Sequence, residues 1–189
     1  MPTDEAKTEA ILKSALELFV EKGFHGTPVP LIAENAGVGA GTIYRSFESK
    51  EALVNALYQR WKQEVVDRMV KDFPATSPPR EQFRIIWERM TDFALRHPRE
   101  LSFLELHHHG TYLDQQSLAI EHGIIEFGVM VVRRGQEMQA IRKADPILLI
   151  ELANGAFLGI FRAAIEGRLE LSKRMFMEAE QCCWEAIRA

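Results

Sequence analysis

One glycine-punctuated segment, residues 32–53, constrains the fold of this chain more than any other. It reads IAENAGVGAGTIYRSFESKEAL. Ile32 and Ala36 lie at helical spacing, and the run stops at Gly37, which adopts left-handed backbone without a Cβ clash. Val38 is the apolar residue that such a turn buries between two helices. The segment therefore predicts a helix-turn-helix, followed at once by another helix.

The helix after the turn is predicted to expose a polar face. Ile43 and Phe47 are four residues apart and face inward. Hydroxyl and guanidinium groups occupy the other faces, and such groups bond phosphate oxygens and base edges. Small residues at the helix start allow close approach to another surface, and a free helix N-terminus attracts phosphate. The candidate DNA-binding residues are Thr27, Gly39, Ala40, Gly41, Thr42, Tyr44, Arg45, Ser46 and Lys50. An ordinary helical hairpin with solvated polar residues is the alternative.

From Glu9 to Leu57 the chain resembles the DNA-binding domain of the TetR family of bacterial repressors. The matching segments are ILKSALELFVEKGFHGT, IAENAGV, GTIYRSF and KEAL. The resemblance implies a homodimer whose variable C-terminal domain binds a small molecule and releases DNA. The sequence is thus interpreted as a ligand-responsive repressor that binds a palindromic operator.

Two positions depart from the family pattern. The second helix opens with prolines in TPVPLIA, which leaves Thr27 or Val29 to cap it. Glycine and alanine at positions 39 and 40 stand where family members often carry serine and a longer polar residue. Base reading is therefore expected to depend mainly on Thr42, Arg45 and Ser46.

The charge of the first domain runs against DNA binding. Residues 1–52 hold five Lys or Arg against eight Asp or Glu, a net charge of −3. Most of the acids belong to the first helix, while Arg45 and Lys50 lie on the expected contact face. This balance predicts few ionic phosphate contacts. It leaves open the alternative of a dimeric all-helical interaction or ligand-binding protein that has lost DNA binding.

Length and composition favour an all-α chain with one small and one larger domain. The chain has 189 residues, 47% of them hydrophobic, which is enough to bury a sizeable core. The helix-turn-helix domain is expected at residues 1–52, and a helical effector-binding and dimerisation domain at 53–189. Helices are predicted at Lys50–Phe73, Arg80–His97, Leu101–His109, Gln115–Ile141, Pro146–Glu166 and Ser172–Ile187. Glycines at 123, 128 and 135 are expected to bend or loosen the helix from Gln115.

A stripe of small residues near the C-terminus predicts a close helix contact. Gly155, Gly159 and Ala163 recur every four residues. Such a stripe suits a symmetric dimer, although packing within one subunit is the alternative. The candidate dimer residues are Gly155, Gly159, Ala163, Met175, Cys182 and Trp184.

Bulky side chains from several predicted helices are candidates for an effector pocket. They are Trp87, Met90, Phe103, His107, Phe127, Met130, Phe157 and Phe161. Together they suit an uncharged or weakly polar ligand that is partly aromatic or acyl. The same side chains would equally fill a core.

Neither a metal site nor catalysis is indicated. Successive residues on a helix point about 100° apart, so three adjacent imidazoles at His107, His108 and His109 do not converge on one ion. One buried histidine and two solvated neighbours is the simpler interpretation. The chain has no phosphate-cradling glycine loop, CxxC pair, nucleophile elbow or HExxH. We expect no enzyme activity and no cofactor.

The expected compartment is the cytoplasm. The segment MPTDEAKTEA is acidic and lacks an apolar core, unlike a signal peptide. We expect no membrane span, which needs an apolar run of roughly 20 residues. Cys182 and Cys183 are adjacent, so a disulfide between them would be strained. The expected partners are operator DNA, a small-molecule effector of unknown identity and a second copy of the chain, with no membrane partner.

Overall fold

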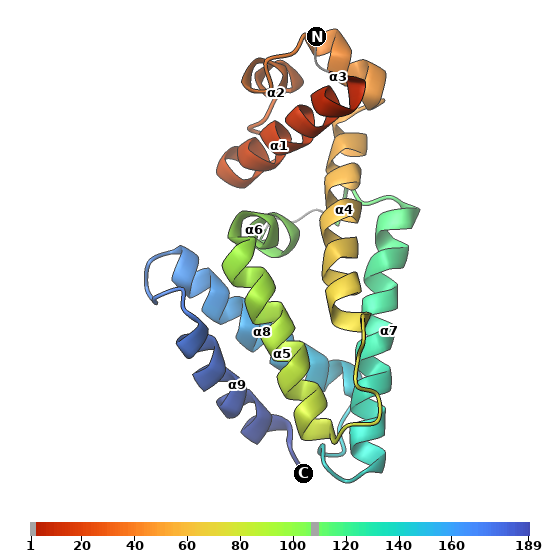
Figure 1. The fold of residues 1–189 in the computed structure, drawn as a ribbon, viewed down its shortest axis with the longest axis vertical. Coiled ribbons are helices and arrows are strands. Elements are labelled where there is room, and N and C mark those ends of the chain that lie inside the picture. Colours follow the sequence, from red (N-terminus) through yellow and green to blue (C-terminus); the bar gives the residue numbers. More distant parts are fainter. Residues whose placement is uncertain (1–2, 107–109) are drawn as a thin grey trace. The chain divides into compact units, whose positions relative to one another are not determined.

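The computed structural model describes residues 3–106 and 110–189, and within these residues the chain is almost wholly helical (Figure 1). The helices are α1 (Asp4–Lys22), α2 (Val29–Asn35), α3 (Ala40–Ser46), α4 (Lys50–Val70), α5 (Pro79–Arg96), α6 (Pro98–Leu106), α7 (Gln115–Glu137), α8 (Pro146–Ile165) and α9 (Lys173–Ile187). A single antiparallel bridge between Ile141 and Arg188 is the one β pairing in the described part of the chain. The predicted all-α class is confirmed.

The helices form two compact units. Unit 1 holds the chain up to Lys62 together with Arg99–Leu118, and unit 2 holds Gln63–Pro98 and Ala119–Ala189. The division falls inside α4 and again near the start of α7. The domain boundary after residue 52 stays a prediction.

In unit 1, α1, α2 and α3 pack around a small apolar core. Thr3 caps α1 by accepting a hydrogen bond from the Ala6 amide at 3.2 Å. The buried Ser14 hydroxyl donates to the Ile32 carbonyl at 3.0 Å and so joins α1 to α2. Side chains that are 0–2% exposed fill the space between the helices: Ile11, Ala15, Phe19, Ile32 and Ile43.

The turn between α2 and α3 has the predicted geometry. Gly37 has φ +65°, a left-handed conformation that favours glycine. Its amide donates to the Glu34 carbonyl at 3.1 Å, and the Val38 amide donates to the Ala33 carbonyl at 3.0 Å. These bonds satisfy the last carbonyls of α2. Val38 is half-buried beneath the turn, which confirms the expected helix-turn-helix.

The start of α2 differs from the sequence prediction. Pro28 is the N-cap, not Thr27 or Val29, and no side chain caps the helix. Pro30 occupies the first turn, where its missing amide hydrogen leaves no donor unsatisfied. A helix that begins on prolines therefore needs less side-chain capping than we expected.

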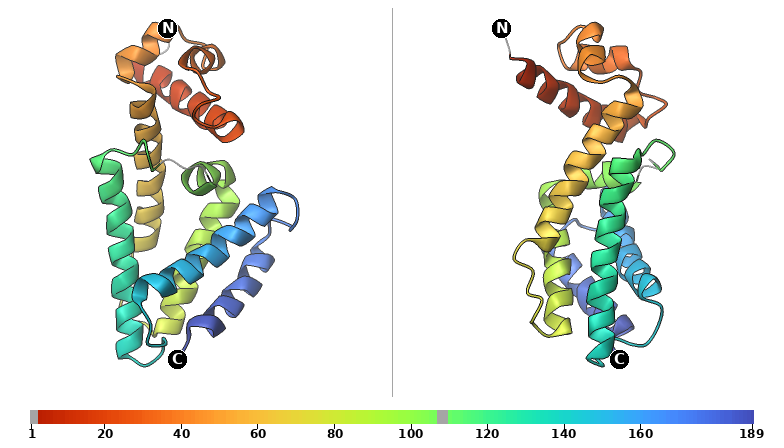
Figure 2. Two further views of the ribbon diagram at one scale, coloured as in Figure 1. Left: turned by 180° about the vertical axis from the view of Figure 1, so that it is seen from behind. Right: turned by 90° about the vertical axis from the view of Figure 1, so that its right-hand side faces the viewer.

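In unit 2, α9 packs against α5 and α8 (Figure 2). A buried cluster forms there from α7, α8, α9 and the chain just after α7. Its members are Val132, Ile141, Leu149, Trp184 and Ile187. Arg80 forms an ion pair with Glu180, and the Arg80 guanidinium lies over the Trp184 ring.

Helix α7 runs without interruption from Gln115 to Glu137 despite its three glycines (Figure 2). A Cβ on Gly128 would lie 3.1 Å from Ile150 Cδ1, and one on Gly135 would lie 2.5 Å from Ile141 Cδ1. Close packing against neighbouring side chains, rather than a break in the helix, accounts for these two glycines.

Helix α8 is the most apolar helix and corrects one sequence inference. Its 20 residues are long and apolar enough, by length and composition alone, to cross a membrane, and 22% of its apolar window is buried. The run contains two charged residues, Glu151 and Arg162. A single helix of this kind is weak evidence for a membrane span.

Candidate nucleic-acid interface

Helix α3 presents a polar, solvent-exposed face, as its sequence predicts. Ile43 is 2% exposed and anchors the helix, whereas Tyr44 is 57% exposed. Arg45 Nη2 donates to Thr42 Oγ1 at 3.2 Å, one turn earlier on the same face. The Ser46 hydroxyl donates to the Thr42 carbonyl at 3.4 Å. The guanidinium is therefore oriented by a neighbour while remaining open to solvent.

The start of α3 is exposed and uncrowded. Gly39 is the N-cap, and no side chain caps the helix. A Cβ added at Gly39 or Gly41 would meet no described atom within 4 Å. Packing inside the described unit thus gives no reason for glycine at either position. Ala40 is also exposed, so this helix start is accessible to a large partner.

Thr27 does not belong to this surface, which corrects the predicted contact. Its side chain is 0% exposed. The Thr27 hydroxyl bonds the Leu18 carbonyl at 3.1 Å and the Gly23 carbonyl at 2.8 Å, so it closes the loop between α1 and α2. A threonine that satisfies carbonyls inside a loop cannot also present its hydroxyl to DNA.

Lys50 holds the same loop, so its ammonium has intramolecular partners as well as the predicted phosphate contact. Its Nζ donates to the Phe24 carbonyl at 2.8 Å and to the Thr27 carbonyl at 3.2 Å. The ammonium also lies 3.9 Å from the centroid of the Phe24 ring, in cation–π range. Sequence spacing placed Lys50 in the first turn of α4, but it did not reveal that the loop carbonyls converge there.

Two acidic side chains of α1 lie beside arginines elsewhere in unit 1. Glu9 accepts from Arg60 Nη1 at 2.7 and 2.8 Å, and Glu17 lies 3.7 Å from Arg99 Nη1. A charge count over residues 1–52 omits both arginines. The α1 acids therefore weigh less against DNA binding than the sequence count indicated.

A further contact that the sequence analysis missed lies in unit 1, at the loop between α6 and α7. The Tyr112 ring stacks on Phe24 with centroids 4.0 Å apart, and its hydroxyl lies 2.9 Å from His25 Nε2. Buried Asn55 of α4 donates to the Tyr112 carbonyl at 2.7 Å and accepts from the Asp114 amide at 2.9 Å. A polar Asn among the apolar positions of α4 was the one signal in the sequence.

The described effector candidates are divided between the two units. Phe103 lies in unit 1, where its ring faces Phe19 with centroids 6.2 Å apart. Met130 is 53% exposed, and His107 lies outside the described residues. As members of an effector pocket, these residues stay predictions.

The remaining aromatic candidates of unit 2 pack closely together. Trp87 Nε1 donates to the Phe176 carbonyl at 2.8 Å. The Trp87 and Phe157 ring centroids are 5.3 Å apart, and those of Phe157 and Phe176 are 4.7 Å apart. Phe161 is 0% exposed. This group therefore has the geometry of a core. Half-buried Phe127 packs against Phe73, and Met90 is half-buried on α5.

The candidate dimer residues also divide. Ala163 and Trp184 are buried inside unit 2, so their assignment to a dimer surface is corrected. Gly155 is exposed, Gly159 has open space beside it, and Met175 is half-buried. The sequence analysis missed four exposed apolar side chains of α8: Ile147, Leu148, Leu152 and Ile165.

The two adjacent cysteines have different environments. Cys182 is exposed and Cys183 is buried, and both are free thiols. Burial raises the pKa of the Cys183 thiol to about 11, with the nearby Glu180 adding to the shift. Cys183 is therefore protonated at neutral pH and unreactive.

Metal binding gains no support from this part of the chain. Within residues 3–106 and 110–189, no group of three His, Cys, Asp or Glu side chains is placed to hold an ion. His107, His108 and His109 lie outside the described residues.

A tri-helical unit with this turn and this exposed third helix defines the class of helix-turn-helix regulators. Comparison with known families gives the particular one. Residues 11–57 match the family described as bacterial regulatory proteins of the tetR family, and residues 58–189 match the tetracyclin repressor-like C-terminal domain. The chain belongs to the TetR family.

Individual relatives agree with this family. The fatty acid metabolism regulator protein of Bacillus subtilis is 30% identical over 86 residues, which are 46% of this chain and 44% of that protein. The match thus spans less than half of that relative.

Solved structures share the fold along nearly the whole chain. A TetR family transcription regulator from Marinobacter aquaeolei VT8 superposes with a TM-score of 0.83 at 22% identity, covering 98% of this chain and 97% of that one. The transcriptional regulator FadR from Bacillus subtilis, solved in complex with stearoyl-CoA, gives 0.76 at 20% identity, covering 93% and 96%.

Proposed function

We propose that this protein is a DNA-binding transcriptional repressor that inserts α3 into the major groove of a palindromic operator. The carrying observation is the exposed face of α3, on which Thr42 orients the Arg45 guanidinium beside an uncrowded helix start. Arginine reads guanine edges with two parallel hydrogen bonds. Tyr44 and the amides at the start of α3 bind backbone phosphates, and the glycines permit close approach.

A DNA-binding repressor is favoured over a dimeric all-helical protein that has lost DNA binding. Loss of DNA contact would leave no requirement for glycine at positions 39 and 41, where the described unit leaves open space. The acids that make the first domain negative are partly matched by Arg60 and Arg99. Few ionic contacts remain on α3, so we expect modest affinity for random DNA and a shallow salt dependence.

A homodimer is the second part of the proposal. Leu148, Leu152, Gly155 and Gly159 recur at intervals of four, three and four residues, which places them on one face of α8. Leu148 and Leu152 are 53% and 51% exposed, an unusual exposure for two leucines on one face of a helix. A second copy of the helix would cover them.

The proposed effector is an acyl thioester of coenzyme A. The name of the Bacillus subtilis relative and the bound stearoyl-CoA of its solved structure support this class. The aromatic group around Trp87 and Phe157 is packed closely, so an acyl chain would have to displace side chains to enter it. A ligand then alters DNA affinity through its different affinities for the two conformations. We place the protein in the cytoplasm, where operator and acyl thioester meet.

A gel shift with the DNA upstream of the protein's own gene tests DNA binding. Wild-type protein should retard this fragment, and Arg45→Ala should not at the same concentration. Lys13→Ala, which removes an exposed cation of α1 rather than of α3, is the matched control and should behave as wild type. Equal retardation of specific and random DNA by all three proteins would reject the operator proposal.

Titration with stearoyl-CoA tests the effector separately. Its affinity should differ between protein alone and protein bound to operator, because a coupled ligand prefers one state. Equal affinity in both conditions removes this compound from the proposal while leaving DNA binding intact.

A further inference from the structure

A cationic basin opens in unit 2 between α4, α5 and the start of α9. Its volume is about 630 Å³, within the usual range for small-molecule sites. The described cationic lining residues are Arg68, Lys71, Arg89, Arg96 and Lys173. Acidic lining residues are fewer among those described: Asp72, Glu88 and Asp92. The basin is thus locally positive on a chain whose formal net charge is −4. None of the predicted effector residues that the structure describes lines it.

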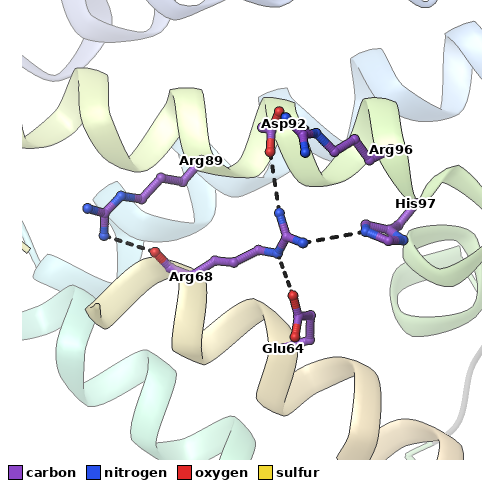
Figure 3. Close-up of polar contacts among 6 residues, drawn as sticks. All are labelled: Glu64, Arg68, Arg89, Asp92, Arg96 and His97. Atoms are coloured by element: carbon purple, nitrogen blue, oxygen red, sulfur yellow. Dashed lines mark hydrogen bonds and ion pairs between the residues drawn. The ribbon is translucent and has the colours of Figure 1, made fainter. Parts of the chain in front are cut away.

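Two of the acids are already neutralised by arginine. Asp92 is shared between Arg68, 3.3 Å away, and Arg96, 2.9 Å away (Figure 3). Glu88 accepts from Arg84 at 2.7 Å. These carboxylates therefore cancel little of the charge that the lysines contribute.

The arginines of the basin are held in place. The Arg68 guanidinium lies between Glu64, Asp92 and His97, and Figure 3 shows its three nitrogens directed at three different partners. Arg89 Nη1 donates to the Arg68 and Met69 carbonyls at 2.9 and 2.8 Å. These donors fix the walls and leave little freedom to follow a ligand.

Lys71 and Lys173 differ from the arginines. Both are exposed, and neither ammonium has a hydrogen bond or ion pair with any described residue. Lys71 directly follows α4 and Lys173 is the first residue of α9, more than a hundred residues further along the sequence. Two unpaired ammonium groups over a pre-formed cationic wall are suited to an anion with several oxygens.

We propose that this basin binds the phosphate groups of a small phosphorylated ligand, with Lys71 and Lys173 as its principal contacts. The site goes beyond the proposed acyl effector, because it recognises the phosphate whether or not an acyl chain is attached. Ile85 and Leu95 add only two apolar side chains to the described lining, so an acyl chain finds little apolar surface here.

The position of the basin gives binding a structural consequence. Arg89 donates to the last carbonyls of α4, and its Nη2 also reaches the Asp72 carbonyl at 3.3 Å. Arginine at a helix C-terminus satisfies carbonyls that have no partner within the helix. A phosphate held between Lys71 and Lys173 therefore lies beside the C-terminal end of α4. The first residue of the same helix, Lys50, holds the helix-turn-helix loop.

Calorimetric titration of the full chain with inorganic pyrophosphate and with coenzyme A tests the proposal. Lys71→Gln with Lys173→Gln should weaken binding about tenfold or more, because charge-assisted hydrogen bonds are lost. The matched control, Lys13→Gln with Lys143→Gln, removes the same charge from exposed lysines outside the basin and should bind as wild type. Thermal denaturation of both variants checks that they are folded.

Binding of both probes means that phosphate alone is recognised. Binding of coenzyme A but not of pyrophosphate means that the nucleotide also contributes. Each result supports the site provided that the basin variant binds the probe more weakly than wild type. Failure of wild type to bind either probe overturns the proposal, as does equal affinity of the two double variants. A gel shift with the basin variant and no ligand should match wild type. Failure of the wild-type protein to bind DNA would reject the proposed repressor function, and it leaves the basin result unaffected.

Discussion

Lys50 links the start of α4 to the loop between α1 and α2 by hydrogen bonds to two loop carbonyls. The loop is otherwise closed by the buried Thr27 hydroxyl and by ring stacking of Phe24 on Tyr112. Its conformation sets the direction in which the chain enters α2 and, through the tight turn, α3. At the residue scale, the unit that carries α3 thus depends on side chains that lie outside α3.

Replacing Lys50 with methionine should therefore destabilise the protein. The substitution keeps the aliphatic length but removes two bonds from a charged donor and the cation–π contact, at a cost of about 1–3 kcal/mol. Lys13→Met, on the exposed surface of α1, should change stability by less than about 0.5 kcal/mol. Urea denaturation measures both. Equal stability of the two variants would show that the loop does not need the ammonium.

Arg45 and Tyr44 should separate base reading from phosphate binding. Arg45→Ala is expected to relax preference at one position of each half-site, at a cost of roughly 1–3 kcal/mol. Tyr44→Phe should weaken binding to all sequences by a similar factor, because it removes a hydroxyl directed at phosphate. Affinities for a set of single-base operator variants distinguish the two. If Arg45→Ala weakens every variant equally, Arg45 contacts phosphate.

At the element scale, α7 ends at Glu137 rather than at the predicted Ile141, but other helix ends followed from apolar spacing and proline positions. The end of α4 before the proline-rich segment and the end of α5 before Pro98 are examples. Long-range contacts were not accessible in this way. The spacing of apolar residues in α7 did not predict that Ile141 packs against Gly135. The sequence of α4 did not predict that Asn55 donates a hydrogen bond to the Tyr112 carbonyl.

Two glycines of α7 should respond to alanine with opposite signs. Gly135→Ala places a Cβ against buried Ile141 and should cost about 1–3 kcal/mol through overpacking. Gly123→Ala meets open space among the described residues and should stabilise the helix by about 0.5–1 kcal/mol. Thermal denaturation of the pair provides the measurement, and a shift of the same sign in both would contradict the packing explanation.

At the scale of the whole molecule, the family and the fold class were predictable from local motifs, whereas the contact surfaces were not. Trp184 and Ala163 matched the expected dimer pattern but lie in the core of unit 2. Aromatic side chains likewise matched a pocket and were found packed together. A periodic apolar pattern indicates that a residue is buried, and only the structure shows whether it is buried within its own subunit.

Gly159→Leu should convert the proposed dimer to a monomer. A Cβ at position 159 meets no described atom of its own chain within 4 Å, so a folded monomer is expected rather than an unfolded chain. Leu152→Arg, which places a charge on the same exposed face, should have the same effect. Gly123→Leu is the matched substitution on another open helix surface and should stay dimeric. Sedimentation velocity reports all three, and dimers of unchanged affinity in the first two would exclude this face of α8.

Selection of bound sequences from a random pool of duplex DNA tests the central claim most directly. The protein should enrich an inverted repeat whose half-site centres are separated by roughly 34–36 Å or a multiple of it, as a two-fold dimer of recognition helices requires. Arg45→Ala, selected in parallel, should enrich a repeat that is degenerate at one symmetric position. Enrichment of no sequence by the wild-type protein, or of a single unrepeated site, would contradict the account.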